Sequence, residues 1–505
     1  MQPDFLVVGA GASGCALANR LSEDPSVRVL LLERGPRSSS PATLVPRAFP
    51  LALRSPRMTS YPTLPIVGTG QPEYWVRGIG LGGSTVINGM MYLRGEPSAY
   101  DELEATTEDG WGWTAFRSAF DDLERRYLHP TTAPLNPLSE RIVDAMSARG
   151  ALRVPDLNGA VGARAGATPG TILSGVRRSA EQAFVAPVAN RPNLHVLTGV
   201  EAQSLLWQGK QVVGVRARRG QSTGDILAGR VVLSAGTIET PLLLERSGIG
   251  QPDLLRRAGI DVRVESPRVG EGVREQRGQS LQLYLRHGVA GSRELSTPTG
   301  IVRETVRYAV ARTGALARPA YDVTGLLPSG GHGGPVELQV MAVPFALDRG
   351  GALRPDRAPG VLLVGYPIRP TTASSIHINA DDPTGPPRIA ARYEETPEDV
   401  AAQRALSASL RTIARAPALV DVTDATRSSG VIHRAGHGSS IYHAVGSVAL
   451  GPHDQCPADP QLRVRGTTGL YVADLSILPF HTSGSTAAPA MAIGWLAADR
   501  LLASD

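Results

Sequence analysis

The first 33 residues of this 505-residue chain follow a pattern that constrains the fold more than any other stretch. An apolar run at residues 5–8 leads into a glycine-rich turn at residues 9–14, a helical pattern follows, and a second apolar run at residues 27–32 ends in Glu33. Strand, glycine turn, helix, strand and acid, in this order, are typical of a Rossmann-like unit that binds a dinucleotide. The sequence therefore predicts an α/β fold with a nucleotide site near its N-terminus.

The residue types in this turn fit the phosphates and the ribose of a nucleotide. The first glycine of the motif permits the tight turn, the second lets the backbone approach a pyrophosphate, and the third lets helix and strand pack closely. The start of the helix offers free N–H groups to phosphates, and Glu33, nineteen residues past Gly14, can accept hydrogen bonds from ribose hydroxyls. The residues expected to bind the cofactor here are Gly9, Gly11, Ala12, Ser13, Gly14, Glu33 and Arg34.

Charge and cysteine content argue against several other classes of protein. The formal net charge is +5, but arginine and acidic residues are mixed along the chain and no basic run alternates with aromatics, so we expect no nucleic acid partner. The two cysteines give neither a disulfide framework nor a metal-ligand spacing, which fits a reducing compartment. No apolar run has the length of a membrane span, and a first strand that begins by Phe5 leaves no room for a signal peptide. We therefore expect a cytoplasmic protein without a metal site.

Residues 77–95, RGIGLGGSTVINGMMYLRG, resemble the first signature of the glucose–methanol–choline (GMC) family of FAD-dependent oxidoreductases. In that family the segment runs along the flavin and the pyrophosphate of FAD, where small residues let the backbone lie against a flat ring. Ile87 occupies the position at which some members carry a histidine bonded to the flavin, so the resemblance implies non-covalent FAD. The residues implied to contact FAD are Gly82, Gly83, Ser84, Asn88, Gly89, Met90 and Met91.

Residues 236–250, GTIETPLLLERSGIG, match the second GMC signature. The pair Thr240 and Pro241 predicts a helix that begins there, with a cap and a proline in its first turn. By resemblance, Ala235 and Gly236 lie at FAD, and Val200 lies near the adenine.

The resemblance covers nearly the whole chain and implies two domains. The Rossmann-like FAD-binding domain comprises residues 1–155, 190–270 and 431–505, and the substrate-binding domain residues 156–189 and 271–430. Apolar runs predict strands of an antiparallel sheet, covered by helices, in the second domain; they lie at residues 280–285, 336–343, 361–366 and 375–378.

The C-terminal region carries the residues that the resemblance makes catalytic. His443, in the segment IYHAVGS at 441–447, matches the histidine that takes the hydroxyl proton of an alcohol while hydride passes to flavin N5. Asp474 matches an aspartate that reaches FAD. Ser485 and Thr486 precede the last helix, at residues 490–502, whose N-terminus would face the flavin, so both are expected to contact the cofactor.

At two places the sequence departs from the family pattern, and the roles of the residues there stay open. The sequence VREQ at 273–276 replaces a Leu-Gln-Asp-His, which puts the role of that Asp-His pair in doubt. Ser485 also stands where the family carries a second catalytic His or Asn. Three alternatives follow: Ser485 has a weaker orienting role, His481 substitutes from four residues upstream, or the chemistry has changed.

The sequence therefore predicts an FAD-dependent alcohol dehydrogenase or oxidase. It would oxidise a small primary or secondary alcohol to a carbonyl and pass the electrons to oxygen or another acceptor. The alternatives are an FAD-containing lyase of the hydroxynitrile-lyase type and a relative with altered, non-alcohol chemistry.

Overall fold

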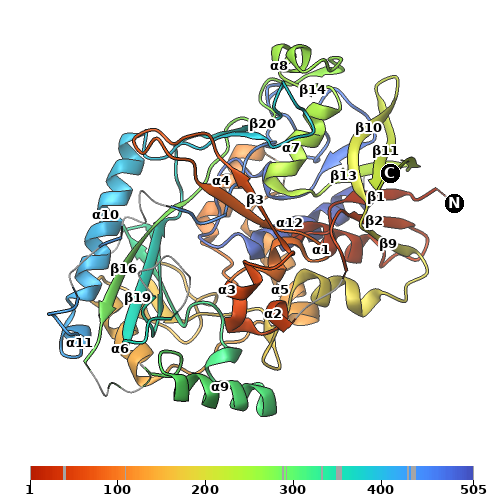
Figure 1. Ribbon diagram of the computed structural model, residues 1–505. Coiled ribbons are helices and arrows are strands. Elements are labelled where there is room, and N and C mark those ends of the chain that lie inside the picture. Colours follow the sequence, from red (N-terminus) through yellow and green to blue (C-terminus); the bar gives the residue numbers. More distant parts are fainter. Residues whose placement is uncertain are drawn as a thin grey trace.

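The computed structural model describes residues 2–37, 41–108, 110–286, 289, 291, 293–330, 334–347, 355–428, 432–433 and 439–503. Two large sheets organise the molecule. Figure 1 shows a parallel sheet near the two labelled termini, at the right, and a mainly antiparallel sheet at the left.

The first sheet contains five parallel strands in the order β24-β13-β1-β2-β9. Their bounds are β1 (Phe5–Val8), β2 (Val29–Glu33), β9 (Leu194–Thr198), β13 (Arg230–Leu233) and β24 (Leu470–Val472). All four residues of β1 are buried, as expected of a parallel strand covered on both faces. The α/β fold with a Rossmann-like sheet is confirmed.

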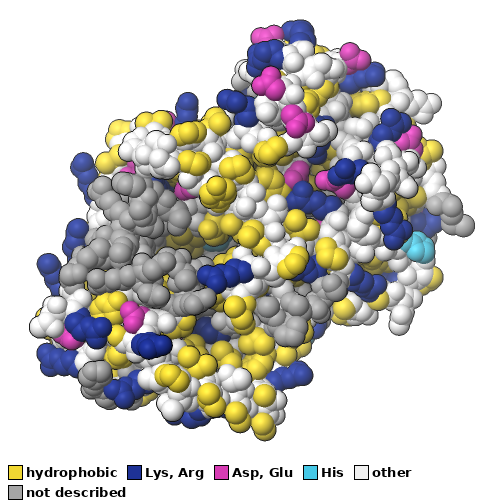
Figure 2. Space-filling view, viewed as in Figure 1, with side chains coloured by type: hydrophobic (Ala, Val, Ile, Leu, Met, Phe, Trp, Pro, Cys, Tyr) yellow, Lys and Arg dark blue, Asp and Glu magenta, His cyan; other side chains and the backbone are white. Residues whose placement is uncertain are grey.

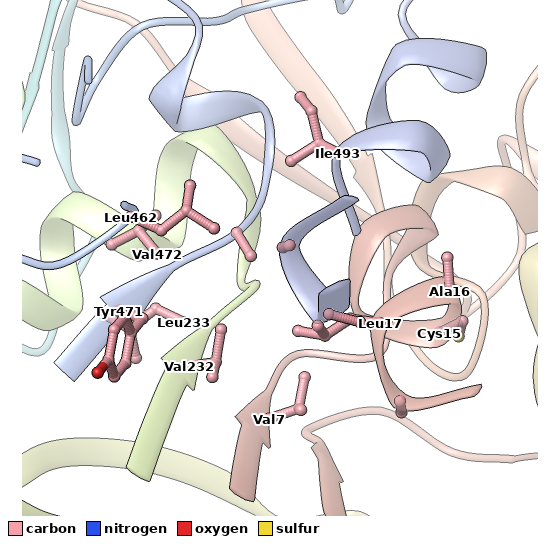
Figure 3. Packing of buried hydrophobic residues seen from close by; sticks show 14 of the residues in the cluster. Val7, Cys15, Ala16, Leu17, Val232, Leu233, Leu462, Tyr471, Val472 and Ile493 are labelled. Carbon is pink, nitrogen blue, oxygen red and sulfur yellow. The ribbon is translucent and has the colours of Figure 1, made fainter. Parts of the chain in front are cut away.

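Two helices, α1 (Ala12–Leu21) and α12 (Ala487–Leu502), pack against each other beside this sheet. Glycine permits the close approach, because a Cβ on Gly494 would lie 2.1 Å from the carbonyl O of Ser13. Ser13 Oγ also donates to the carbonyl O of Ala490 at 2.7 Å. Figure 3 shows Leu17 of α1 and Ile493 of α12 above the strands. The C-terminal helix is thus fixed at the glycine turn.

The helix predicted to begin at Thr240 and Pro241 begins earlier. In the structure α7 spans Gly236–Arg246, so Pro241 lies inside the helix. The cap comes from a distant part of the chain, because Asp474 Oδ2 accepts the backbone N–H of Gly236 at 2.8 Å and the Thr240 hydroxyl at 2.7 Å. This tertiary contact supplies an acceptor for a free backbone N–H in the first turn of α7, a role that a local N-cap side chain would otherwise have.

The second sheet has the order β22-β16-β19-β18-β17-β6-β5, with β23 also paired to β16. All of its pairs are antiparallel except β5 with β6. The strands are β5 (Leu152–Arg153), β6 (Arg164–Ala167), β16 (Arg277–Tyr284), β17 (Val323–Pro328), β18 (Val336–Val343), β19 (Gly360–Pro367), β22 (Ile432–His433) and β23 (Ser439–Ser440).

The predicted antiparallel sheet covered by helices is confirmed. Helices α6 (Pro137–Ser147), α10 (Pro397–Ala414) and α11 (Pro417–Val420) share one buried apolar cluster with its strands. One predicted strand lies elsewhere: β20 (Ser375–His377) pairs with β21 (Arg388–Ala390) in a separate hairpin. The domain boundaries given above stay a prediction, and α6 and β5 lie with the second sheet.

The remaining elements connect or flank the two sheets. A three-stranded antiparallel sheet, β10 (Glu201–Gln208), β11 (Gln211–Arg219) and β12 (Ser222–Leu227), accompanies the parallel sheet. The other short strands are β3 (Met58–Pro62), β4 (Tyr74–Gly78), β7 (Ile172–Leu173), β8 (Val176–Arg177), β14 (Ile249–Gly250) and β15 (Val264–Glu265). The other α-helices are α2 (Pro41–Leu44), α3 (Phe49–Ala52), α4 (Pro97–Thr107), α5 (Trp113–Leu123), α8 (Pro252–Arg257) and α9 (Pro298–Ala311). Within the described ranges, no helix combines the length and the apolar character that a bilayer span requires.

Candidate active site

A cavity of about 930 Å³ lies between the two large sheets. Its walls come from the C-terminal ends of β1, β2 and β13 on one side and from β16, β18 and β19 on the other. Ligand pockets in open α/β sheets occur at such strand ends. The cavity is lined by most of the residues predicted from the sequence, namely Gly9, Gly11, Ala12, Ser13, Glu33, Arg34, Gly83, Ser84, Asn88, Gly89, Met90, Met91, Val200, Ala235, Gly236, His443, Asp474, Ser485 and Thr486.

The three predicted residues outside this lining are Gly14, Gly82 and His481. Gly14 has a packing role, because a Cβ there would lie 1.9 Å from the carbonyl O of Gly9. The backbone N–H of Gly82 donates to the carbonyl O of Ala10 at 2.8 Å, which holds the first signature segment against the glycine turn. These two glycines do not line the cavity but hold together the segments that form its wall.

The glycine turn leaves open space where a pyrophosphate would lie. No described atom is found within 4 Å of a Cβ built on Gly11, whereas a Cβ on Gly83 would lie 2.7 Å from the Cα of Gly11. The two glycine segments therefore touch, and the start of α1 faces the gap beside them. Backbone N–H groups at a helix start, next to open space, fit a phosphate group.

The side chain of Glu33 hydrogen-bonds the backbone of three loop segments around this space. Its carboxylate accepts the backbone N–H of Ala10 at 3.0 Å, of Gly35 at 2.8 Å and of Gly80 at 3.0 Å. A carboxylate has about four lone-pair positions, so one remains for a ribose hydroxyl. Arg34 instead pairs with Glu239 at 2.8 Å, farther along the same cavity wall.

Asn88 has a fixed orientation at the cavity wall. Its Oδ1 accepts Arg177 Nη1 at 2.8 Å and the backbone N–H of Met90 at 3.1 Å. The side-chain amide nitrogen is therefore the group that can donate into the cavity. Arg177 is buried, no carboxylate in the described part of the chain pairs with it, and burial lowers the pKa of its guanidinium to about 9.

Asp474 lies between the parallel sheet and the cavity. Besides capping α7, it accepts the backbone N–H of Ser476 through Oδ1 at 2.8 Å. Burial raises the pKa of its carboxyl group, although these hydrogen bonds oppose the shift. Asp474 thus fixes the end of α7 while it forms part of the cavity wall.

His443 lines the cavity with a fixed tautomer. Its Nδ1 lies 2.8 Å from Gln276 Oε1, and the Gln276 amide nitrogen donates to the carbonyl O of Ile368 at 2.6 Å. Because the amide orientation is set by that carbonyl, Gln276 can only accept from the ring, so Nδ1 carries the hydrogen and Nε2 the lone pair. Burial, together with the positive charges of His481 and Arg77, lowers the pKa of His443 to about 3. The imidazole is neutral and can accept a proton at Nε2.

Glu275 holds the backbone of the same histidine. Its Oε1 accepts the backbone N–H of His443 at 2.9 Å, and its side chain is fully buried. Burial raises the pKa of Glu275 to about 7, although Arg77, 3.9 Å away, opposes the shift. Tyr442, just before the histidine, has a φ of 67°, which is uncommon for a non-glycine residue and indicates a constrained loop.

Ser485 and His481 occupy different positions. Ser485 lines the cavity; its Oγ accepts the Gln339 amide N–H at 3.5 Å, and its hydroxyl is also hydrogen-bonded to the Tyr366 side chain. His481 lies behind His443, where its Nε2–H donates to the carbonyl O of His443 at 2.9 Å. His481 Nδ1 is buried without a hydrogen-bond partner in the described structure, and burial lowers the pKa of the ring to about 4.

Sequence reasoning missed several residues of this site. Gln276 and Glu275 lie in the VREQ segment, where the departure from the family was the only signal. Gln339 and Tyr366 lie on β18 and β19, near Ser485 and His443, and the sequence carries no motif that marks them. Their roles arise from strand pairing across the second sheet.

Comparison with known proteins identifies related chains over the whole length. A family model described as GMC oxidoreductase matches residues 3–276, and its C-terminal counterpart matches residues 370–494. Pyridoxine 4-oxidase of Microbacterium luteolum is 30% identical over 97% of this chain and 98% of its own length. Alcohol dehydrogenase [acceptor] of Pseudomonas putida is 31% identical over 98% of this chain and 95% of its own length.

Solved structures share the fold. The crystal structure of pyridoxine 4-oxidase from Mesorbium loti superposes with a TM-score of 0.85 at 25% identity and covers 100% of both chains. Formate oxidase superposes with a TM-score of 0.85 at 22% identity and covers 99% of this chain and 98% of its own. At 22% identity, the similarity to formate oxidase supports only the shared fold.

Proposed function

Because the chain belongs to the GMC oxidoreductase family and is an oxidoreductase that acts on CH–OH donors, we propose that it oxidises a small primary or secondary alcohol to a carbonyl with FAD. His443 is the proposed base. The observation that carries this proposal is the neutral imidazole of His443, which lines the cavity and is held by Gln276 through Nδ1.

The cavity residues fit FAD. The open space at Gly11 and the start of α1 suit the pyrophosphate, the free acceptor position of Glu33 suits a ribose hydroxyl, and the amide nitrogen of Asn88 can donate to a polar edge of the flavin. Ile87 lines the cavity with an aliphatic side chain that cannot form a bond to the ring, which supports non-covalent binding. Bound FAD would supply the acceptor for the hydride that leaves the carbinol carbon.

The chain's own residues supply the proton transfer and the orientation. Nε2 of His443 takes the hydroxyl proton, since a neutral imidazole within hydrogen-bond reach acts as a general base. Once it turns away from Tyr366, the O–H of Ser485 can donate to the same substrate oxygen, which stabilises the charge that develops as the proton leaves. Because His481 is bonded to the backbone behind His443, we assign the second role at the cavity to Ser485.

Alcohol-dependent bleaching of the bound flavin tests the proposed function. Under anaerobic conditions, a panel of alcohols should reduce the visible absorption band of the purified holoenzyme, and readmitted air shows whether oxygen reoxidises it. Release of a carbonyl compound from a cyanohydrin without bleaching would instead indicate a lyase. A protein that cannot be reconstituted with FAD would contradict the cofactor assignment.

Gln276 should act as a positioning residue for the base. Replacing it by leucine should lower the rate of flavin reduction about 10–100-fold with little change in alcohol affinity, because the ring loses the acceptor that fixes its tautomer. Gln276→Glu keeps an acceptor and should restore part of the rate. Gln403→Leu removes another buried glutamine, bonded to Gln279, and serves as the control. Equal losses in both leucine variants would mean that Gln276 acts only through packing.

A further inference from the structure

Helix α9 exposes an apolar stripe to solvent. Val302, Val306 and Val310 are 62%, 57% and 83% exposed and follow one another at intervals of four residues, so they lie along one side of the helix. Ile301, 46% exposed, adjoins them. Figure 2 shows apolar side chains gathered at the lower edge of the molecule, where α9 lies in Figure 1.

The attachment of α9 is polar. Its buried side carries Glu304, which is 2% exposed and whose Oε2 accepts the backbone N–H of Ala315 at 2.8 Å. Tyr308 adds a hydrogen bond to the carbonyl O of Gly175 at 2.9 Å. An amphipathic helix of a globular protein normally buries its apolar stripe and exposes its charges. Helix α9 instead exposes its apolar stripe and buries Glu304, which indicates that the stripe has a partner outside the chain.

The charges around the stripe are basic. The exposed charged side chains of α9 and its C-cap are the arginines Arg303, Arg307 and Arg312, and Arg303 also pairs at 3.3 Å with Glu304, the buried acid of the helix. Apolar side chains flanked by arginines are typical of a helix that lies in the plane of a membrane interface and faces anionic lipids. A second copy of this helix would instead bring arginines against arginines.

The stripe adjoins residues that line the active-site cavity. Ile301 of α9 and Leu51 of α3 both line that cavity, and they are 46% and 59% exposed. The wall inside them is also apolar and includes Leu295, Leu316 and Phe345. Apolar side chains that line the cavity are therefore exposed beside the stripe.

We propose that the surface formed by α9 and Leu51, the α9 surface, docks on an anionic lipid bilayer, with the valines at the headgroup–acyl boundary and the arginines at the lipid phosphates. Resting on the proposed function, this places the cavity mouth at the membrane. An apolar alcohol dissolved in the bilayer can then enter without crossing water.

Vesicle co-sedimentation of the full-length holoenzyme tests the docking. Wild type should bind vesicles of phosphatidylcholine with phosphatidylglycerol, should bind less in high salt, and should bind weakly to phosphatidylcholine alone. The double variant Val302→Asp/Val306→Asp should lose at least about tenfold in binding. Val67→Asp alters an 85% exposed valine in the β3–β4 connection and should bind as wild type does.

Arginine variants measure the electrostatic contribution to vesicle binding. Arg303→Gln and Arg307→Gln should each weaken binding to the anionic vesicles about fivefold. Wild-type protein that does not sediment with anionic vesicles would overturn the proposal. So would an oligomer that the valine variants dissociate without any vesicle binding, since α9 would then contact a second copy. Because binding is measured without turnover, a failure of the proposed alcohol chemistry would not be mistaken for a failure of docking.

Discussion

Replacing His443 by alanine should lower the rate of alcohol-dependent flavin reduction by about a thousandfold, while the protein still binds FAD. The imidazole is the group at the cavity that is both neutral and oriented to accept a proton, since burial keeps its pKa near 3 and Gln276 holds Nδ1–H. Stopped-flow reduction by a saturating alcohol measures the step directly.

Two neighbouring variants serve as controls for this loss. Ser485→Ala removes a hydroxyl at the cavity and should only slow reduction, because the base remains. His481→Gln alters a ring that contacts the backbone of His443 and should have the smallest effect of the three. A larger loss in His481→Gln than in His443→Ala would assign the base to His481 and contradict our interpretation.

The pH profile gives an independent check on the same assignment. Because the pKa of His443 lies near 3, its protonation cannot limit the rate at pH 5 and above. Burial raises the pKa of Glu275 to about 7, so its carboxylate becomes protonated as the pH falls below that value. The negative charge next to His443 stabilises the imidazolium that forms during proton transfer, so the rate should fall on the acid side near pH 7. Glu275→Gln should remove this decrease of the rate at acid pH. If the decrease is unchanged in the variant, Glu275 is excluded as its cause.

Replacing Gly11 by valine should abolish FAD binding without unfolding the protein. The φ of Gly11 is −77°, which any residue adopts, and a Cβ there meets no described atom within 4 Å. The apoprotein therefore accommodates the side chain, but valine occupies the space that a pyrophosphate needs. We expect the affinity for FAD to fall at least about a hundredfold, which corresponds to about 2.7 kcal/mol.

Titration of the apoprotein with FAD measures this effect, and circular dichroism checks the fold. Gly224→Val is the matched control, because a Cβ on Gly224 also has no described atom within 4 Å and β12 lies outside the cavity. A Gly11→Val protein that binds FAD as tightly as wild type would mean that the cofactor lies elsewhere in the cavity.

The N-terminal strand–turn–helix–strand unit could be predicted from the sequence alone. Residues 5–33 predict strand, turn, helix and strand, and each step depends on neighbours within a few residues, so the chain specifies it locally. β1 and α1 form as predicted, and β2 ends at Glu33 as expected. The family resemblance similarly pointed to His443 and to the glycine segment at 82–83 because those signatures are contiguous.

Which distant groups contact those residues depends on the tertiary fold. Gln276 and His443 are 167 positions apart and meet through their side chains beside β16, and Asp474 caps α7 from 238 positions away. No sequence window contains such pairs, so the start of α7 was predicted four residues late and the contacts of Gln276 were missed. The exposure of the apolar stripe of α9 could not be predicted from the sequence either. Helical spacing predicts that its valines share a face of the helix. Whether that face is exposed depends on how the whole helix packs against the rest of the chain.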